Sequence, residues 1–343
     1  MKTTLEILGW QPFFAQQVSA NELDETPPVR VMEVHRRGLH VLGENIDTQT
    51  PSGVDATIGD WLLLNSSEPV LSRVLDRKSL IKRRAPGTHV KVQLIAANID
   101  TAFIVSSCNQ DFNVARLERY IAMALEAAVT PVIVLTKTDL CDNPDQYIEE
   151  AQTISASVPV VVLDARGDEP KSKLAKWSGP GQTVGFLGSS GVGKSTLVNA
   201  LSETLDIATQ AIREKDDKGK HTTTSRQIHI VANGCAVMDT PGMREIQLID
   251  ASSGVNDLFA DIHDLSLQCR FNDCQHQTEP GCAIVAAVEN GIIDSARLKR
   301  WEKLVAEERE NNTSIAGKKS GDKSLEKKSR AIKKENKNDQ RVR

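Results

Sequence analysis

The sequence predicts a multi-domain protein in which a small β-barrel precedes an α/β domain and a mainly helical metal-binding domain. Three observations support this. Short β-like segments fill residues 29–85, strands alternate with helices from about residue 99, and Cys and His cluster near residue 270. Roughly five short strands in such a span are typical of an OB-like barrel, and strand–helix alternation indicates a mostly parallel sheet. We expect domains at 1–85, 86–248 and 249–310, followed by a tail at 311–343.

The composition excludes several classes of protein. Hydrophobic residues make up 39% of the 343 and charged residues 26%, as in a soluble globular protein. No apolar run approaches the roughly 18 residues of a membrane span, and the N-terminus lacks the continuous apolar stretch of a secretory signal. We therefore expect a cytoplasmic protein with no membrane partner.

The C-terminal tail differs in charge from the rest of the chain. Residues 315–343 contain 11 Lys/Arg and 4 Asp/Glu, a net charge of +7, which leaves −11 for the remainder. The tail has no aromatic residue and almost no apolar ones, so we expect it to be disordered. Its charge indicates either a nucleic-acid partner or a merely solvated segment.

The most specific motif is a phosphate-binding loop. Residues 188–195 read GSSGVGKS, which matches G-x-x-x-x-G-K-[ST], follows an apolar strand and opens a helix. The glycines allow backbone N–H groups to surround phosphates, while Lys194 reaches the outer phosphates and the Ser195 hydroxyl binds Mg²⁺. The nucleotide-binding residues predicted here are Gly188, Ser189, Ser190, Gly191, Val192, Gly193, Lys194, Ser195 and Thr196.

A second motif lies at the end of a later apolar strand. Residues 239–242 read DTPG and match the D-x-x-G signature of P-loop GTPases. In that signature Asp239 meets the Mg²⁺ shell and the Gly242 N–H senses the γ-phosphate. We assign both residues to the catalytic centre.

A third motif predicts which base is bound. Residues 136–139 read TKTD after an apolar strand, and this resembles the N/T-K-x-D signature that binds guanine. The Asp139 carboxylate can accept hydrogen bonds from guanine N1–H and the N2 amine, which adenine does not offer. The base-binding residues predicted here are Thr136, Lys137, Thr138 and Asp139, with Thr136 in place of the commoner Asn.

The order of these motifs indicates a circular permutation. Ordinary GTPases place the base-binding motif roughly a hundred residues after the phosphate loop, whereas here Asp139 precedes Gly188 by 49 residues. A fold tolerates such rearrangement when its original termini lie close together. Residues 163–165, LDA, then occupy the second base-contact position, although the usual Ser is missing.

The segment between the phosphate loop and DTPG contains the candidates for the catalytic group that activates water. Residues 220–224 read KHTTT between the phosphate loop and DTPG, and we expect a threonine, Thr223, to bind Mg²⁺ there. His221 is a candidate catalytic residue, although it can equally be a surface histidine. Met243 follows Gly242 where many GTPases carry a water-orienting Gln, so we expect slow unassisted hydrolysis.

A fourth motif predicts a metal. Cys269, Cys274, His276 and Cys282 lie within 14 residues, and three thiolates with one imidazole suit a tetrahedral structural Zn²⁺. Four ligands complete a tetrahedral shell and leave no open coordination position, so the expected role of the metal is structural. The other cysteines are scattered among apolar segments and are expected to be small buried side chains: Cys108, Cys141 and Cys235.

Together, the permuted motifs, the β-rich N-terminal region, KHTTT and the C-x4-C-x-H-x5-C pattern resemble the ribosome small-subunit-dependent GTPase A (RsgA) family. The resemblance covers roughly residues 30–300. It implies an OB domain that contacts ribosomal RNA, a GTPase domain and a zinc domain, with GTP or GDP, Mg²⁺ and one structural Zn²⁺ as cofactors. It also implies a role in late maturation of the small ribosomal subunit, with GTPase activity stimulated by that subunit. We expect the protein to be a monomer.

The sequence also has to be compared with three alternative functions. A metabolic P-loop kinase with a zinc module is disfavoured because TKTD selects guanine. A non-catalytic or weakly catalytic RNA-binding scaffold is disfavoured by the intact Lys194, Ser195 and Asp239. A paralogous GTPase with a different activator would share all of these motifs.

Overall fold

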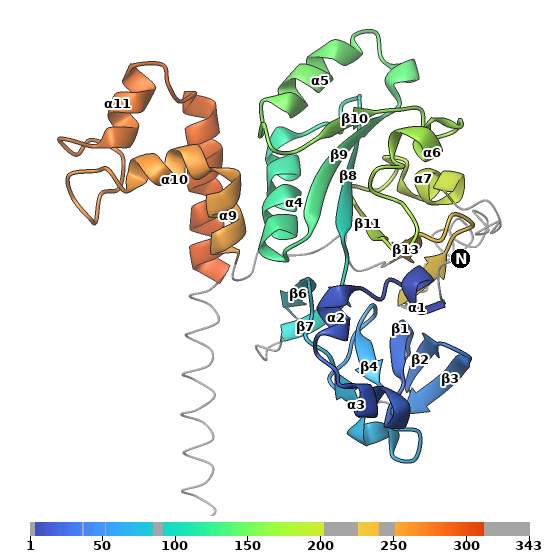
Figure 1. Cartoon of the computed structure of the whole chain (residues 1–343). Helices are drawn as coiled ribbons and strands as arrows, with labels where there is room; N and C mark the ends of the chain where they lie inside the picture. Colours follow the sequence, from blue (N-terminus) through green and yellow to red (C-terminus); the bar gives the residue numbers. More distant parts are fainter. Residues whose placement is uncertain are drawn as a thin grey trace, which may run out of the picture. The chain divides into compact units, whose positions relative to one another are not determined.

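The structure is a computed structural model that describes residues 4–35, 38–51, 53–84, 92–201, 226–239 and 251–311 (Figure 1). The chain divides into two compact units. One contains residues 1–82, 94–246 and 253–260, and the other contains residues 83–93, 247–252 and 261–343. Within the described ranges, no helix combines the length and apolarity that crossing a membrane requires. The basic tail predicted to be disordered lies outside the described residues.

The N-terminal region opens with three short helices. They are α1 (Thr4–Ile7), α2 (Pro12–Ala15) and α3 (Ala20–Glu25). A reciprocal capping box fixes the start of α3: the Ser19 hydroxyl accepts from Glu22 N–H, and the Glu22 carboxylate accepts from Ser19 N–H at 3.0 Å.

Five strands follow, in agreement with the predicted β-rich segment: β1 (Pro28–His35), β2 (Gly38–Gly43), β3 (Ile46–Pro51), β4 (Trp61–Leu63) and β5 (Arg73–Val74). A 3-10 turn, Pro69–Leu71, precedes β5. All pairings among these strands are antiparallel, with β1 against β2 and β4, β2 against β3, and β4 against β5. Their shared core contains Val29, Val31, Leu39, Val41, Leu62 and Leu64.

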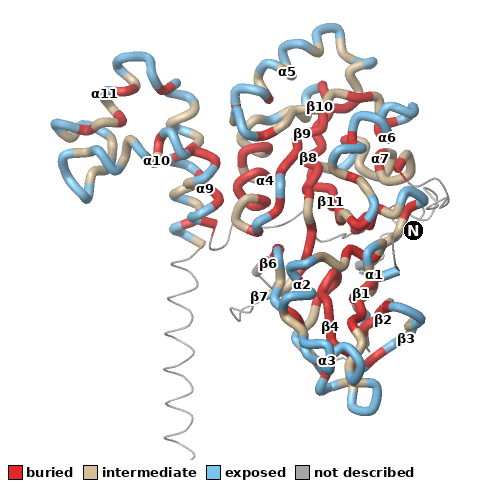
Figure 2. Tube along the Cα trace, in the orientation of Figure 1, coloured by how far each residue is buried: buried red, intermediate tan, exposed pale blue. Residues whose placement is uncertain are grey.

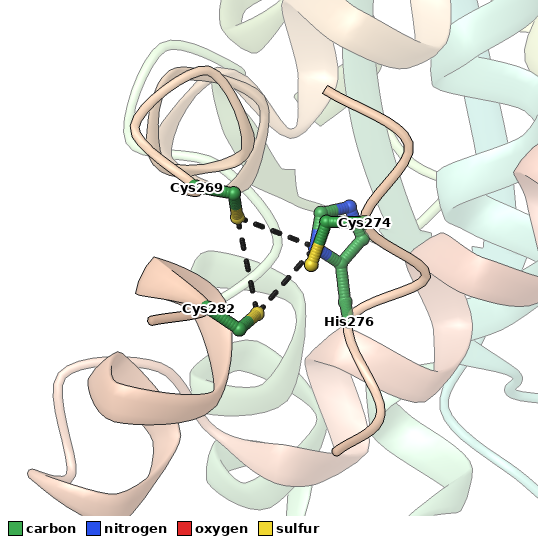
Figure 3. Close-up of side chains that lie close together, drawn as sticks. All are labelled: Cys269, Cys274, His276 and Cys282. Carbon is green, nitrogen blue, oxygen red and sulfur yellow. Dashed lines mark hydrogen bonds between the residues drawn. The ribbon is translucent and has the colours of Figure 1, made fainter. Parts of the chain in front are cut away.

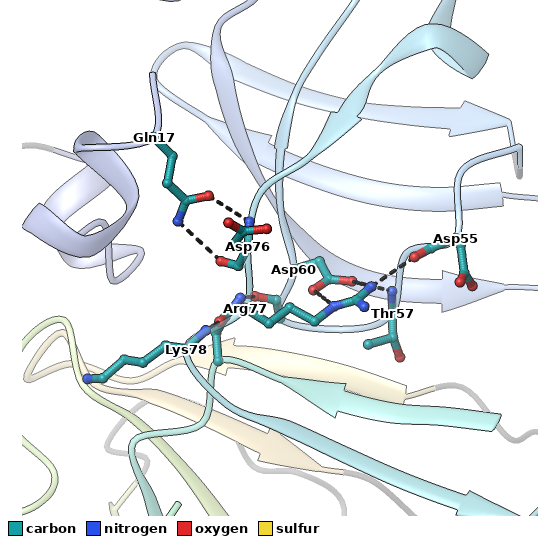
Figure 4. Close-up of polar contacts among 9 residues, drawn as sticks. Gln17, Asp55, Thr57, Asp60, Asp76, Arg77 and Lys78 are labelled. Carbon is teal, nitrogen blue, oxygen red and sulfur yellow. Dashed lines mark hydrogen bonds and ion pairs between the residues drawn. The ribbon is translucent and has the colours of Figure 1, made fainter. Parts of the chain in front are cut away.

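Basic side chains between residues 73 and 84 pair with carboxylates of the protein itself (Figure 4). Arg77 donates to both oxygens of the fully buried Asp60 carboxylate, at 2.8 and 2.9 Å. These hydrogen bonds raise the pKa of Arg77, while burial raises the pKa of Asp60. Arg73 pairs with Glu22, and Lys78 pairs with Asp100. All three cations therefore have carboxylate partners within the protein, and the pair between Arg77 and Asp60 is the buried one.

The central sheet has the parallel core that the sequence predicted. Its strands are β8 (Thr101–Ser107), β9 (Thr130–Thr136), β10 (Val160–Val162), β11 (Thr183–Leu187) and β13 (Ala236–Asp239). They lie in the order β10-β9-β8-β11-β13, and each neighbouring pair is parallel. Every residue of β8 is buried, as expected of a strand covered on both faces, and its centre, residues 102–105, is apolar (Figure 2).

Helices cover both faces of this sheet. They are α4 (Val114–Glu126), α5 (Pro144–Gln152), α6 (Glu169–Lys173) and α7 (Lys194–Leu201). Figure 1 shows α4 and α5 on one side, with α6 and α7 on the other. A 3-10 turn, Thr138–Leu140, separates β9 from α5. The arrangement is a doubly wound α/β domain, whose ligands bind at the carboxyl ends of the strands.

Strand β12 (Arg226–Ile230) joins this sheet to the N-terminal strands. It forms a hairpin with β13, in which Gly234 has a φ of +79° and the Asn233 side chain accepts from Cys235 N–H. It also pairs with β1, Gln227 against Glu33. One mixed sheet of 11 strands results. Two further strands, β6 (Leu80–Arg84) and β7 (Val92–Ala97), pair separately.

The C-terminal part is helical, as predicted. It contains α9 (Ser252–Leu258), α10 (Ala260–Ser266), α11 (Ala283–Glu289) and a helix at residues 295–311. At Gly254 the backbone of α9 lies so close to α4 that an added Cβ would stand 2.0 Å from Ala122 O. In the second unit the buried side chains include Ile284, Ile293 and Trp301.

Candidate nucleotide site and metal centre

The predicted nucleotide motifs meet at one edge of the central sheet. Strands β8, β9 and β11 are neighbours that run parallel, and they end at residues 107, 136 and 187. The phosphate loop follows β11 directly, TKTD follows β9, and residues 163–165 follow β10. Carboxyl ends of adjacent parallel strands are the usual ligand-binding edge of such folds.

The phosphate loop has the backbone shape that its glycines permit. Gly188 has a φ of +143°, and a Cβ there would lie 2.3 Å from Val105 O. Gly193 has a φ of +102°, immediately before Lys194 begins α7. The Lys194 ammonium donates to Gly188 O at 2.8 Å and to Ser189 O, so it lies folded across the loop. Ser195 and Thr196 lie in the first turn of the helix.

Thr136 ties the base-binding motif to the phosphate loop. This residue is completely buried, and its hydroxyl donates to Val192 O at 2.7 Å. A Cβ built on Gly193 would stand 3.6 Å from that hydroxyl and 3.8 Å from the Ala165 Cβ, so three segments converge here. The hydroxyl at position 136 is sufficient to reach the phosphate loop, so Thr can replace the commoner Asn there. Lys137 follows with a left-handed φ of +59°.

An arginine that the sequence motifs did not include lies beside the base-binding carboxylate. Arg166 Nη2 donates to Asp139 Oδ2, and its Nε lies 3.4 Å from Asp164 Oδ1. The Asp164 carboxylate also accepts from Arg166 N–H at 3.0 Å, which lowers the pKa of Asp164. The hydrogen bond to Asp164 and the charge of Asp139 both raise the pKa of Arg166.

A second unpredicted pair supports the phosphate loop. Arg116, in the first turn of α4, donates to Ser189 Oγ and, at 2.8 Å, to Asp111 Oδ1. This hydrogen bond lowers the pKa of Asp111. The sequence signal for these residues is positional: they flank the N-cap Asn113, whose helix starts after the carboxyl end of β8.

The remaining nucleotide candidates lie at or beyond the limit of the described residues. Asp239 is the last residue of β13, whose neighbour β11 leads into the phosphate loop. His221, Thr223 and Gly242 lie outside the described residues. Their catalytic assignments stay predictions.

The four predicted metal ligands converge in the second unit (Figure 3). Cys269 follows α10, Cys274 and His276 lie in the next loop, and Cys282 is the N-cap of α11. Their ligand atoms all lie within 4.8 Å of one another. Cys269 Sγ is 3.8 Å from Cys282 Sγ, and His276 Nδ1 is 3.5 and 3.6 Å from these two sulfurs.

These distances fit zinc. Thiolates about 2.3 Å and an imidazole nitrogen about 2.0–2.1 Å from a tetrahedral ion place S–S pairs about 3.8 Å and S–N pairs about 3.5 Å apart. A disulfide would need a sulfur–sulfur distance of about 2.05 Å, so the three thiols are free. The cluster is therefore compatible with Zn²⁺.

Neighbouring groups hold the ligand loop in shape. The Glu279 carboxylate accepts from the backbone N–H groups of Gln275, Gln277 and Thr278, at 2.7, 2.9 and 3.1 Å. These bonds lower the pKa of Glu279 to about 2. The His276 ring lies 5.8 Å from the Trp301 ring. Away from the cluster, burial raises the pKa of Cys108 to about 11 and of Cys235 to about 12, so both are inert thiols.

The fold and this edge define a P-loop nucleotide-binding protein whose base-binding strand precedes its phosphate loop. The family profile described as RsgA GTPase matches residues 74–249. This chain belongs to the RsgA GTPase family. An ABC transporter profile also matches residues 178–321, a range that includes the phosphate loop common to both P-loop families.

Relatives cover nearly the whole chain. The chain is 48% identical to "Small ribosomal subunit biogenesis GTPase RsgA 2" of Vibrio parahaemolyticus, over 91% of this chain and 88% of the relative. It is 45% identical to "Small ribosomal subunit biogenesis GTPase RsgA" of Mesorhizobium japonicum, over 91% and 92%. The family resemblance is thus confirmed, and the similarity covers about nine tenths of the chain and not the motifs alone.

Solved structures share the fold. The crystal structure of YjeQ from Thermotoga maritima superposes with a TM-score of 0.60 at 26% identity, over 82% of this chain and 97% of that one. YloQ, titled a circularly permuted GTPase, superposes with a TM-score of 0.58 at 21% identity, over 85% and 98%. The circularly permuted GTPase fold predicted from the motif order is confirmed.

Proposed function

We propose that this chain is a GTP hydrolase that assists late maturation of the small ribosomal subunit and uses hydrolysis to time its release. The observation that carries the proposal is the hydrogen bond from Thr136 to Val192 O, which supports assigning the predicted guanine motif and the phosphate loop to one site. The names of relatives 45–48% identical support the ribosomal role.

In this proposal each residue at the edge of the central sheet has its own role. Lys194 and the N-terminus of α7 hold the outer phosphates, Ser195 and Asp239 belong to the Mg²⁺ shell, and Asp139 accepts from guanine. GTP supplies the anhydride bond that is broken. Gly242, Thr223 and His221 are proposed to close around the γ-phosphate, with Met243 leaving water orientation to a partner.

The flanking regions are proposed to contact the ribosome. The antiparallel strands β1–β5 support an OB-like barrel that binds ribosomal RNA, and the Cys₃His cluster supports a domain built around one structural Zn²⁺. We propose the divisions 1–85, 86–248 and 249–310 with a basic tail. The protein is proposed to act as a cytoplasmic monomer.

The test is GTP turnover with small subunits, with large subunits and alone. Without a partner we expect about 10⁻⁴–10⁻² s⁻¹, and small subunits should raise the rate by up to about 10³–10⁵-fold. Binding to the subunit should weaken steeply with salt because cationic groups release counterions from RNA. Lys194→Ala, which removes the phosphate contact, is the inactive control. Equal rates in all three mixtures would contradict the ribosomal assignment.

A further inference from the structure

We propose that Arg166 competes with the guanine base for the Asp139 carboxylate and thereby sets the affinity and entry rate of guanine nucleotides. The inference rests on the proposed nucleotide site and adds a residue outside its motifs. Its basis is the ion pair in which Arg166 Nη2 donates to Asp139 Oδ2.

Arg166 and the guanine base carry similar N–H donors, so they are alternative partners for the Asp139 carboxylate. The N1–C2–N2 edge of guanine is itself a guanidine fragment, planar and carrying N–H donors that point the same way. The Arg166 guanidinium carries the same kind of planar N–H donors and reaches the same carboxylate through Nη2, which donates to Oδ2. The guanidinium therefore occupies one of the two oxygens that the base edge needs, and the base can bond to both only after Arg166 has moved.

The backbone keeps Arg166 within reach of Asp139. Ala165, the preceding residue, is 7% exposed and belongs to the core beneath the phosphate loop. The Asp164 carboxylate accepts from the Arg166 N–H, which fixes the direction in which the side chain leaves the backbone. The arginine therefore stays at the rim of the base site.

The side chain can nevertheless leave at low cost. It is 63% exposed, so its departure uncovers no core, and Asp164 remains as a second acceptor for the displaced guanidinium. Exposed ion pairs are weak, and a competing state reduces apparent affinity in proportion to its population. The pair should therefore weaken guanine-nucleotide binding by about two- to sixfold.

The experiment compares binding of a fluorescent GDP to the full-length protein and to Arg166→Ala by stopped flow. We expect the variant to bind about two- to sixfold more tightly, through faster association at unchanged dissociation. The ratio of the two affinities should fall towards one as salt rises from about 50 to about 500 mM, because screening weakens the pair in the wild type. Arg73→Ala, which breaks the exposed pair with Glu22, is the matched control and should bind like the wild type.

The outcomes separate this inference from the proposed function. Equal or weaker binding by Arg166→Ala, or faster dissociation, overturns the inference and leaves the nucleotide site standing. If the wild type does not prefer GDP over ADP, the proposed function itself fails.

Discussion

Asp139 is 34% exposed, whereas Thr136, three residues earlier, is completely buried. The two ends of the motif therefore differ: the Thr136 hydroxyl contacts the phosphate loop, and the Asp139 carboxylate is partly exposed. Arg166 contacts only the accessible end.

Replacing Asp139 with Asn should change which base is bound. The amide no longer accepts from both guanine donors, and two lost charge-assisted hydrogen bonds correspond to about a hundredfold weaker GDP binding. Affinity for xanthosine diphosphate should rise, because the amide can donate to the xanthine carbonyl. Equilibrium titration with both nucleotides measures this, with Asp142→Asn as a nearby exposed control. A variant that binds GDP like the wild type would show that TKTD is not the base reader.

At this scale the sequence predicts residues that belong to contiguous motifs and misses those brought in from elsewhere. The phosphate loop and TKTD are readable because their chemistry requires fixed spacing. Arg116 meets Ser189 across 73 residues, and Arg166 meets Asp139 across 27. Only the folded sheet edge brings these arginines to their partners, so the sequence offers no more than their position shortly after a strand.

Among the elements, strands and helices with strong apolar periodicity were predictable. Strand β8 and helix α4 lie where their patterns place them. Strand β3 was not identified as a separate segment because its sequence, IDTQTP, is polar and mostly exposed. Its conformation comes from six residue pairs with β2, a long-range effect that local propensity does not contain.

Helix α4 depends on its N-cap. The Asn113 side chain accepts from Arg116 N–H at 2.9 Å, in the same turn that sends the Arg116 side chain to Ser189. Asn113→Ala should therefore lower the free energy of unfolding by about 0.5–2 kcal/mol, while Asn113→Asp retains the acceptor and should stay near wild type. Urea unfolding monitored by circular dichroism measures both. Equal stability of the Ala variant would mean that the cap contributes nothing.

The ligand loop between α10 and α11 depends on metal. Structural zinc sites contribute roughly 10–16 kcal/mol of apparent binding free energy, so Cys274→Ala should lose zinc and unfold residues 261–311. Nucleotide binding should be retained, because the base and phosphate motifs belong to the other unit. Elemental analysis and hydrogen exchange measure the two effects, with Cys141→Ala as a control outside the cluster. Freshly prepared wild type without stoichiometric metal would refute this prediction.

On the scale of the whole first unit, the buried guanidinium of Arg30 connects β1 to three other segments. Arg30 on β1 is 1% exposed and donates to Leu8 O, to Asn98 O at 3.4 Å and to Thr183 Oγ1 at 2.8 Å. Burial lowers the pKa of Arg30 to about 10, so the guanidinium is still charged at neutral pH. The N-terminal helices, β1 and the start of β11 are thus held at a common point.

Arg30→Leu should loosen this junction. Each buried acceptor left without a donor costs about 1–3 kcal/mol, so amides in β1 and β11 should exchange faster by at least tenfold. Thr183→Val, which removes a single acceptor, should have a smaller effect at the same amides. Hydrogen exchange measured by mass spectrometry tests this. Unchanged protection in both strands would show that apolar packing alone holds the segments together.

The pairing of β1 with β12 has a consequence for how the protein is made. Glu33 is synthesised almost two hundred residues before its partner Gln227, so at 5–20 residues per second this edge of β1 waits about 10–40 s without a neighbour. An open strand edge during translation invites addition of foreign strands. Glu33 and His35, whose side chains lie 2.7 Å apart, place polar and charged groups near this edge. Charged side chains at an open strand edge disfavour pairing with foreign strands, and at this edge they would act until the last strands of the sheet emerge.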